Sequence, residues 1–122
     1  MLEPHIHTHI YPETVFNEKI KVKVHPLDKY QTSSKFNFIN MDVQGGELNV
    51  LLGASKTLKN IDYVMTEVNK DELYKNCALI EDIDYFLSKY NLKRVEESWA
   101  DPFWHSNSEQ PVWGDALYIK EK

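Results

Sequence analysis

The stretch FNFINMDVQGGEL, residues 36–48, decides the fold of this chain. Its first part is mostly apolar, which is typical of a buried strand over residues 36–43. Asp42 lies at the end of that strand, and Gly45 and Gly46 separate the strand from a helix that is expected to begin at Glu47. In an open α/β sheet, ligands bind at the carboxyl ends of the strands. This junction is therefore the first candidate for a functional site.

The rest of the chain continues the alternation of strands and helices. Strands are predicted at residues 20–25, 36–43, 61–68, 92–98 and 113–120, and amphipathic helices at residues 47–59 and 79–90. This order indicates parallel βαβ units, in which the last two strands could form an antiparallel edge. Residues 1–19 are polar and contain prolines, so an irregular arm is expected before a domain of residues 20–122.

Composition limits the class of protein. The chain has 122 residues, of which 42% are hydrophobic and 27% charged, so one small folded domain is expected. The net charge of -5 and the lack of a basic block argue against nucleic acid and against an anionic membrane as partners. The single cysteine, Cys77, excludes an internal disulfide. With no secretory signal and no long apolar run, a soluble, cytoplasmic protein is expected.

Several motifs of the sequence are similar to those of one known family. They are FINMDVQGGEL at residues 38–48, VLLGA at 50–54, IDYV at 61–64 and DALYIK at 115–120. Together they resemble the FkbM-type S-adenosylmethionine-dependent methyltransferases. The resemblance implies an α/β, partial doubly wound Rossmann-like methyltransferase fold. The last four predicted strands would be strands 4–7 of a mixed sheet with order 3-2-1-4-5-7-6 and an antiparallel last strand.

The chain departs from that family in its glycines. Only four are present, and none forms the G-x-G-x-x-G turn that follows a strand in dinucleotide-binding folds. The cofactor-binding half is therefore expected to be missing, leaving the C-terminal half. The strand at residues 36–43 would then be an unpaired apolar edge. We expect this edge to pair with a second copy of the chain, as a homo-oligomer, or with a complementing N-terminal half.

The resemblance implies a function for the complete enzyme. It would be an O-methyltransferase that moves a methyl group from S-adenosylmethionine to a hydroxyl of a small-molecule acceptor, such as a sugar or another secondary metabolite. This chain alone would lack competent cofactor binding. The alternative is a non-catalytic α/β fragment or complementing subunit that associates through its exposed strand.

Two strand-end carboxylates are the predicted catalytic residues. Asp42 and Glu67 follow neighbouring strands and are expected to face one crevice, where a carboxylate can take the acceptor's proton. Asp42, Gln44 and Gly45 are the predicted cofactor-binding residues. The alternatives are that Asp42 only caps the following helix, that the glycines only make a tight turn, and that Glu67 is a solvated loop carboxylate.

Four further residues are predicted to bind the substrate. They are Glu47, Trp99, Trp104 and Trp113. The three tryptophans are included because the resemblance implies that late aromatic loops border the acceptor pocket, and aromatic faces stack on sugar rings. Glu47 could instead only stabilise the dipole of its helix. The tryptophans could instead form a hydrophobic lid over the core.

No metal site is predicted with recognisable ligand spacing. His5, His7 and His9 alternate, so an extended arm would turn them to one side, where they could ligate zinc or iron. No carboxylate lies at a recognisable spacing from them. A metal-binding protein is the third interpretation of the sequence. The alternative is that these histidines belong to a polar surface arm that binds no ligand.

Overall fold

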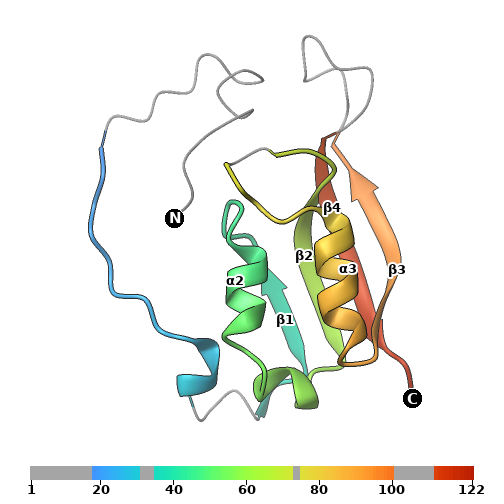
Figure 1. The fold of residues 1–122 in the computed structure, drawn as a ribbon. Helices are drawn as coiled ribbons and strands as arrows, with labels where there is room; N and C mark the ends of the chain where they lie inside the picture. The colour runs from blue at the N-terminus through green and yellow to red at the C-terminus, as the bar shows by residue number, and fades with distance from the viewer. Residues whose placement is uncertain (1–17, 31–34, 73–74, 101–111) are drawn as a thin grey trace.

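The computed structural model describes residues 18–30, 35–72, 75–100 and 112–122 (Figure 1). In these ranges the elements are the 3₁₀ helices η1 (Leu27–Lys29) and η3 (Thr57–Asn60), the α-helices α2 (Glu47–Leu52) and α3 (Ile80–Ser88), and the strands β1 (Phe38–Met41), β2 (Tyr63–Asn69), β3 (Leu92–Trp99) and β4 (Trp113–Lys120). His5, His7, His9 and Trp104, with most of the predicted arm, lie outside the described residues.

The four strands form one mixed sheet of order β1-β2-β4-β3. β1 runs parallel to β2, with Ile39 opposite Val64, and α2 lies in the connection between them. β4 runs antiparallel to both β2 and β3. This is the order and direction predicted for the last four strands of the methyltransferase sheet. The predicted α/β class, a partial Rossmann-like fold, is confirmed.

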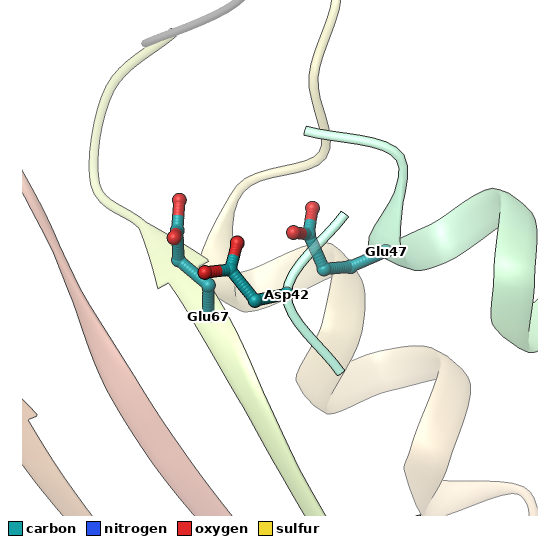
Figure 2. A group of neighbouring side chains, drawn as sticks. All are labelled: Asp42, Glu47 and Glu67. Atoms are coloured by element: carbon teal, nitrogen blue, oxygen red, sulfur yellow. The ribbon is translucent and has the colours of Figure 1, made fainter. Parts of the chain in front are cut away.

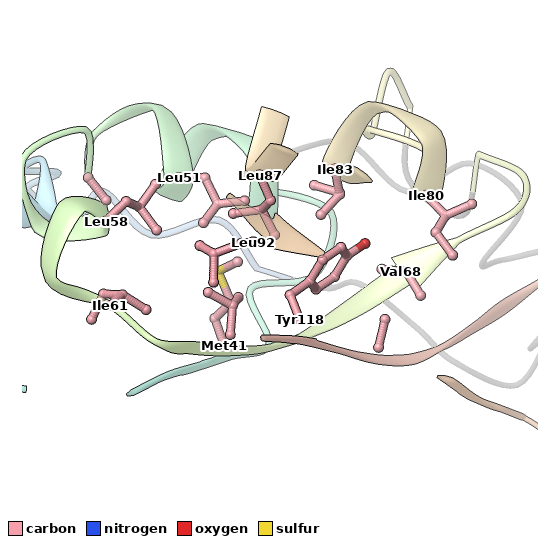
Figure 3. Close-up of a cluster of buried hydrophobic side chains, with 13 residues drawn as sticks. Met41, Leu51, Leu58, Ile61, Val68, Ile80, Ile83, Leu87, Leu92 and Tyr118 are labelled. Atoms are coloured by element: carbon pink, nitrogen blue, oxygen red, sulfur yellow. The ribbon is translucent and has the colours of Figure 1, made fainter. Parts of the chain in front are cut away.

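One face of the sheet carries the hydrophobic core (Figure 3). α3 places Ile80, Ile83 and Leu87 on a single stripe because residues three and four apart lie on one side of a helix. These side chains pack with buried residues of the sheet and of the preceding helices. Tyr118 of β4 is fully buried, and its hydroxyl donates a hydrogen bond to Asp84 Oδ1 at 2.6 Å. α3 is thus anchored to the sheet by both apolar and polar contacts.

The predicted strand at residues 20–25 is wrong. This segment has no strand partner in the described ranges, and its apolar side chains face solvent, with Ile20 78% and Val24 83% exposed. Alternation of apolar and charged residues identifies a strand only where a neighbouring strand can use the backbone groups. No such neighbour lies beside residues 20–25 in the described part of the chain.

The helix predicted over residues 47–59 is also shorter than expected. α2 ends at Leu52 with Gly53 as its C-cap, and η3 begins separately at Thr57. A Cβ at position 53 would lie 3.0 Å from the Cβ of Pro26, so Gly53 allows the close approach of the segment before β1. Gly53 therefore ends the helix.

Asp28 fixes η1 against the start of η3. Its Oδ1 accepts hydrogen bonds from the N–H and the hydroxyl of Thr57 at 2.8 and 2.7 Å. Its Oδ2 accepts bonds from the Lys56 N–H at 2.9 Å and the Ser55 hydroxyl at 3.2 Å. Partial burial alone would raise the pKa of Asp28, but these donors lower it to about 2.

Candidate functional site

Three carboxyl groups meet where β1 and β2 end. Because β1 and β2 are parallel, their carboxyl ends lie at the same edge of the sheet. Asp42 directly follows β1, Glu67 lies near the end of β2, and Glu47 begins α2. One oxygen of each lies within 4.8 Å of one oxygen of the others. Figure 2 shows Asp42 between the other two, with all three carboxyl groups turned to the same side.

Glu47 holds the turn between β1 and α2. Its side chain is only 3% exposed, and its Oε1 accepts hydrogen bonds from the Val43 N–H at 3.2 Å and the Gly45 N–H at 3.4 Å. The turn needs this support because Gln44 and Gly45 both have positive φ, at 53° and 95°. The predicted substrate-binding residue Glu47 thus serves the backbone of the turn as well as lying in the acidic cluster.

Asp42 does not cap the helix. The N-cap of α2 is Gly46, and no side chain makes a capping hydrogen bond there. Asp42 Oδ1 instead accepts a hydrogen bond of 2.8 Å from the side-chain amide of Gln44, and the carboxylate is exposed. The capping alternative is therefore wrong. Asp42 is exposed beside the turn, and the bond from Gln44 orients its carboxylate.

Glu67 is the most perturbed acid of the site. It is 6% exposed, and its Oε1 is buried with no hydrogen-bond partner among the described residues. Burial, followed by the negative charges of Asp42 and Glu47, raises the pKa of Glu67 to about 8. Glu67 is therefore not a solvated loop carboxylate. A carboxyl group with such a pKa can exchange a proton near neutral pH.

A further acid, Asp115, joins this site from β4. Asp115 lies directly opposite Glu67 in the antiparallel pairing of β2 and β4. Burial and the charge of Asp42 raise its pKa above the ordinary value for an aspartate. The sequence prediction missed this role, because only the strand register brings a residue so distant in the chain beside Glu67.

A groove of about 580 Å³ extends from the cluster along the sheet. Asn40, Asp42, Met65 and Asp115 are among the residues that line it. Since side chains alternate between the faces of a strand, Met65 points away from the face that holds the buried neighbour Val64. The groove thus lies on the sheet face opposite the helices. Asp42 is the one member of the three-carboxyl cluster among its lining residues, which also include Glu96, Glu97 and Asp115.

The structure does not bring the predicted tryptophans into this groove. Neither Trp99 nor Trp113 is among its lining residues. Trp99 is half-buried at the end of β3, opposite Gly114, and the Lys70 ammonium group lies 4.1 Å from its ring centroid. A role for Trp99 and Trp113 in acceptor binding remains a prediction.

The chain matches one protein family over most of its length. Residues 3–94 match the Methyltransferase FkbM domain. The chain belongs to this family. The match includes η1, β1, α2, η3, β2, α3 and the start of β3, and therefore the whole acidic cluster. No curated protein and no solved structure matches the chain.

FkbM membership identifies the chain as a methyltransferase-family protein and confirms the resemblance drawn from the junction at residues 38–48. The match reaches upstream to residue 3, into the segment predicted as an arm, and stops before β4. Among the described residues, no helix combines the length and apolar character that crossing a membrane requires.

Proposed function

We propose that this FkbM chain carries the acceptor side of an S-adenosylmethionine-dependent O-methyltransferase. The observation that carries the proposal is the convergence of Asp42 and Glu67 at the ends of two parallel strands, beside a groove that Asp42 lines. In open α/β sheets this edge is where ligands bind. The acceptor would be a small molecule with a hydroxyl group, such as a sugar or another secondary metabolite.

The residues can supply the proton chemistry of the transfer. S-adenosylmethionine, when bound, supplies a methyl group on a positively charged sulfur. The acceptor hydroxyl would lose its proton during that transfer. Glu67, when ionised, would accept this proton, since a pKa of about 8 makes its carboxylate a stronger base than an ordinary glutamate. Asp42 would orient the hydroxyl through its exposed oxygen.

The residues present fit the methionine end of the cofactor. That end carries a cationic sulfur, an ammonium group and a carboxylate; the cluster of Asp42, Glu47 and Glu67 would offer acidic oxygens to the two cationic groups, and the cofactor's carboxylate would lie away from the cluster. Gln44 and Gly45, in their positive-φ turn, present backbone groups beside Asp42. The glycine-rich turn that holds the nucleoside would come from a complementing half, because none of the four glycines forms such a motif.

Calorimetry with S-adenosylhomocysteine tests this proposal. The chain is titrated alone and after addition of the separately expressed glycine-rich half of an FkbM enzyme. Binding is expected only in the mixture, and Asp42→Asn should weaken it about tenfold. Asp71→Asn, in an exposed acid outside the cluster, is the matched control. Absence of binding in every mixture would contradict the cofactor assignment.

Activity of the same mixture tests the role of Glu67. With a panel of sugar hydroxyls as acceptors, Glu67→Gln should lower the rate of methyl transfer about 100-fold, a larger loss than its effect on S-adenosylhomocysteine binding. A variant as active as the parent would remove Glu67 from the chemistry.

A second candidate function is a non-catalytic module that associates through β1. In the described part of the chain, β1 pairs only with β2, so its other edge has unpaired backbone groups. Phe36 and Phe38, beside and within this strand, are 62% and 49% exposed. An edge of this kind suits strand pairing with a second copy or with a complementing half.

Sedimentation velocity tests association through β1. Phe38→Lys places a charge in the edge strand and should abolish any dimer. Tyr85→Lys changes an exposed aromatic residue on α3 and is the matched control, which should leave the dimer intact. A parent chain that stays monomeric at all concentrations, with freely exchanging β1 amides, would rule out self-association.

A further inference from the structure

Glu67 presents an oxygen that the described structure does not satisfy. Glu67 is 94% buried (6% exposed), and its Oε1 has no hydrogen-bond partner in the described ranges. A buried carboxyl oxygen without a partner is unfavourable and calls for a proton donor, a water or a cation. Figure 2 shows this carboxyl group beside that of Asp42 and turned to the same side, and one of its oxygens lies within 4.8 Å of an oxygen of Asp42 and of Glu47.

We propose that Asp42, Glu47 and Glu67 bind one divalent metal cation. Each offers a carboxylate oxygen, and these oxygens lie within 4.8 Å of one another. No ion pair joins any of the three to a lysine or arginine among the described residues. A bound cation would supply the positive charge that the cluster lacks and the partner that Glu67 Oε1 lacks.

The spacing and the donor type limit the metal. Calcium–oxygen distances are about 2.3–2.6 Å, so two ligands on opposite sides of the ion are about 4.6–5.2 Å apart. Three oxygens no more than 4.8 Å apart thus fit a calcium-sized ion without rearrangement. Magnesium, with bonds of about 2.0–2.1 Å, would hold opposite ligands about 4.0–4.2 Å apart and so demands a tighter arrangement of oxygens than calcium. An all-carboxylate set favours these hard ions, or manganese, over zinc.

Two of the three acids accept hydrogen bonds from neighbouring groups that do not belong to the cluster. Gln44 orients Asp42 through Oδ1, and the Val43 and Gly45 N–H groups orient Glu47 through Oε1. Metal-binding carboxylates are commonly fixed by such outer partners. The ligand positions are therefore largely preformed, and the site does not depend on whether the chain transfers a methyl group.

Sequence spacing could not predict this site. The three acids come from the end of β1, the start of α2 and the end of β2, so no short ligand motif exists. Only the parallel pairing of β1 with β2 brings Glu67 to the other two. His5, His7 and His9, whose alternating spacing could ligate a metal, lie outside the described residues.

Calorimetric titration of the full chain with Ca²⁺, Mg²⁺ and Mn²⁺ separately, at constant ionic strength, tests the site. We expect one ion per chain with a dissociation constant of about 1 mM or tighter. Glu67→Gln and the exposed Asp42→Asn should each weaken binding at least about tenfold. Asp71→Asn and Glu121→Gln, in exposed acids outside the cluster, are the matched controls.

The outcomes separate the cation site from the proposed methyl transfer. One ion per chain, lost in Glu67→Gln and Asp42→Asn and kept in both controls, establishes the site without any activity measurement. Circular dichroism must show that each variant is folded; if Glu67→Gln is not, Asp42→Asn decides. No binding of any of the three ions below about 10 mM, or binding equally affected by the control variants, overturns the proposal.

Discussion

Asp28 and Glu67 are carboxyl groups of one small domain in opposite surroundings. Asp28 accepts four hydrogen bonds from Ser55, Lys56 and Thr57, and its pKa is lowered to about 2. Glu67 is buried beside two other acids, has an oxygen without a partner among the described residues, and its pKa is raised to about 8. Thus the fold stabilises the charge of Asp28 and opposes that of Glu67.

The difference separates an acid whose charge the fold stabilises from one whose charge the fold opposes. The donors around Asp28 all belong to the segment that it fixes in place, so its bonds are complete within the chain. The neighbours of Glu67 repel its charge, and what they favour is a proton, a cationic ligand or a metal ion. Acids in unfavourable electrostatic surroundings at the carboxyl ends of parallel strands are typical of ligand sites.

The largest predicted effect is the pH dependence that Glu67 gives to stability. Its folded-state pKa of about 8 is above the ordinary 4.5, so the folded state binds more protons between these values. The contribution of Glu67 to the free energy of unfolding should therefore be fully present below about pH 4.5. It should fall by on the order of 4 kcal/mol as the pH rises to 8. Glu67→Gln should lack this component. Urea unfolding of both proteins with a chelator present measures it.

The same series needs a control with an acid outside the cluster. Asp71→Asn should keep the pH dependence of the parent, because Asp71 is exposed and lies outside the cluster, where its Oδ1 accepts a local bond from the Glu72 N–H. Parallel curves for the parent and Glu67→Gln from pH 5 to 8 would show that Glu67 titrates normally. The contrast with Asp28 would then disappear.

A smaller effect is predicted at Asp28. Asp28→Ala removes the acceptor for two partly buried donors, the N–H and hydroxyl of Thr57, and for two exposed donors on Ser55 and Lys56. It should therefore lower the free energy of unfolding by about 2 kcal/mol at pH 7. In the parent, this stabilisation is present above about pH 4 and is lost as the pH falls toward about 2. Denaturant titration at pH 7 and pH 2.5 checks both statements. Equal stability of variant and parent at pH 7 would contradict them.

The smallest effect is predicted for Asp42→Asn. Removing this charge beside Glu67 should lower the pKa of Glu67 and raise the free energy of unfolding at pH 7 by about 1 kcal/mol. Replacing an acid that stabilises the fold would instead lower the free energy of unfolding, as predicted for Asp28→Ala. Thermal unfolding in the presence of a chelator gives the sign, and a loss of more than about 1 kcal/mol would assign Asp42 to the structure.

The sequence predicted the local features of the fold well. A buried strand, a turn and a helix all follow from residues 36–48, since each leaves its own short-range pattern. The strand order followed from the family resemblance and is confirmed. The strand at residues 20–25 was wrong because alternation does not report whether a pairing neighbour exists, and α2 was predicted too long because Gly53 was taken as part of the helix.

The acidic site was predicted only in part. Asp42 and Glu67 were placed at one crevice because both end parallel strands. The bond of Glu47 to the turn depends on the positive φ of Gln44, which no local signal in the sequence marked. The place of Asp115 depends on the register between β2 and β4, which sequence patterns of the separate strands do not determine.

The pKa of Glu67 itself tests the central claim most directly. Titration of its side-chain carboxyl carbon by NMR, in chain labelled at glutamate and freed of divalent ions, follows this one group, with Glu67→Gln assigning the signal. A midpoint near pH 8 is predicted for the acidic site described here. A midpoint near 4.5 would show that the cluster does not oppose the charge of Glu67, and would contradict the account.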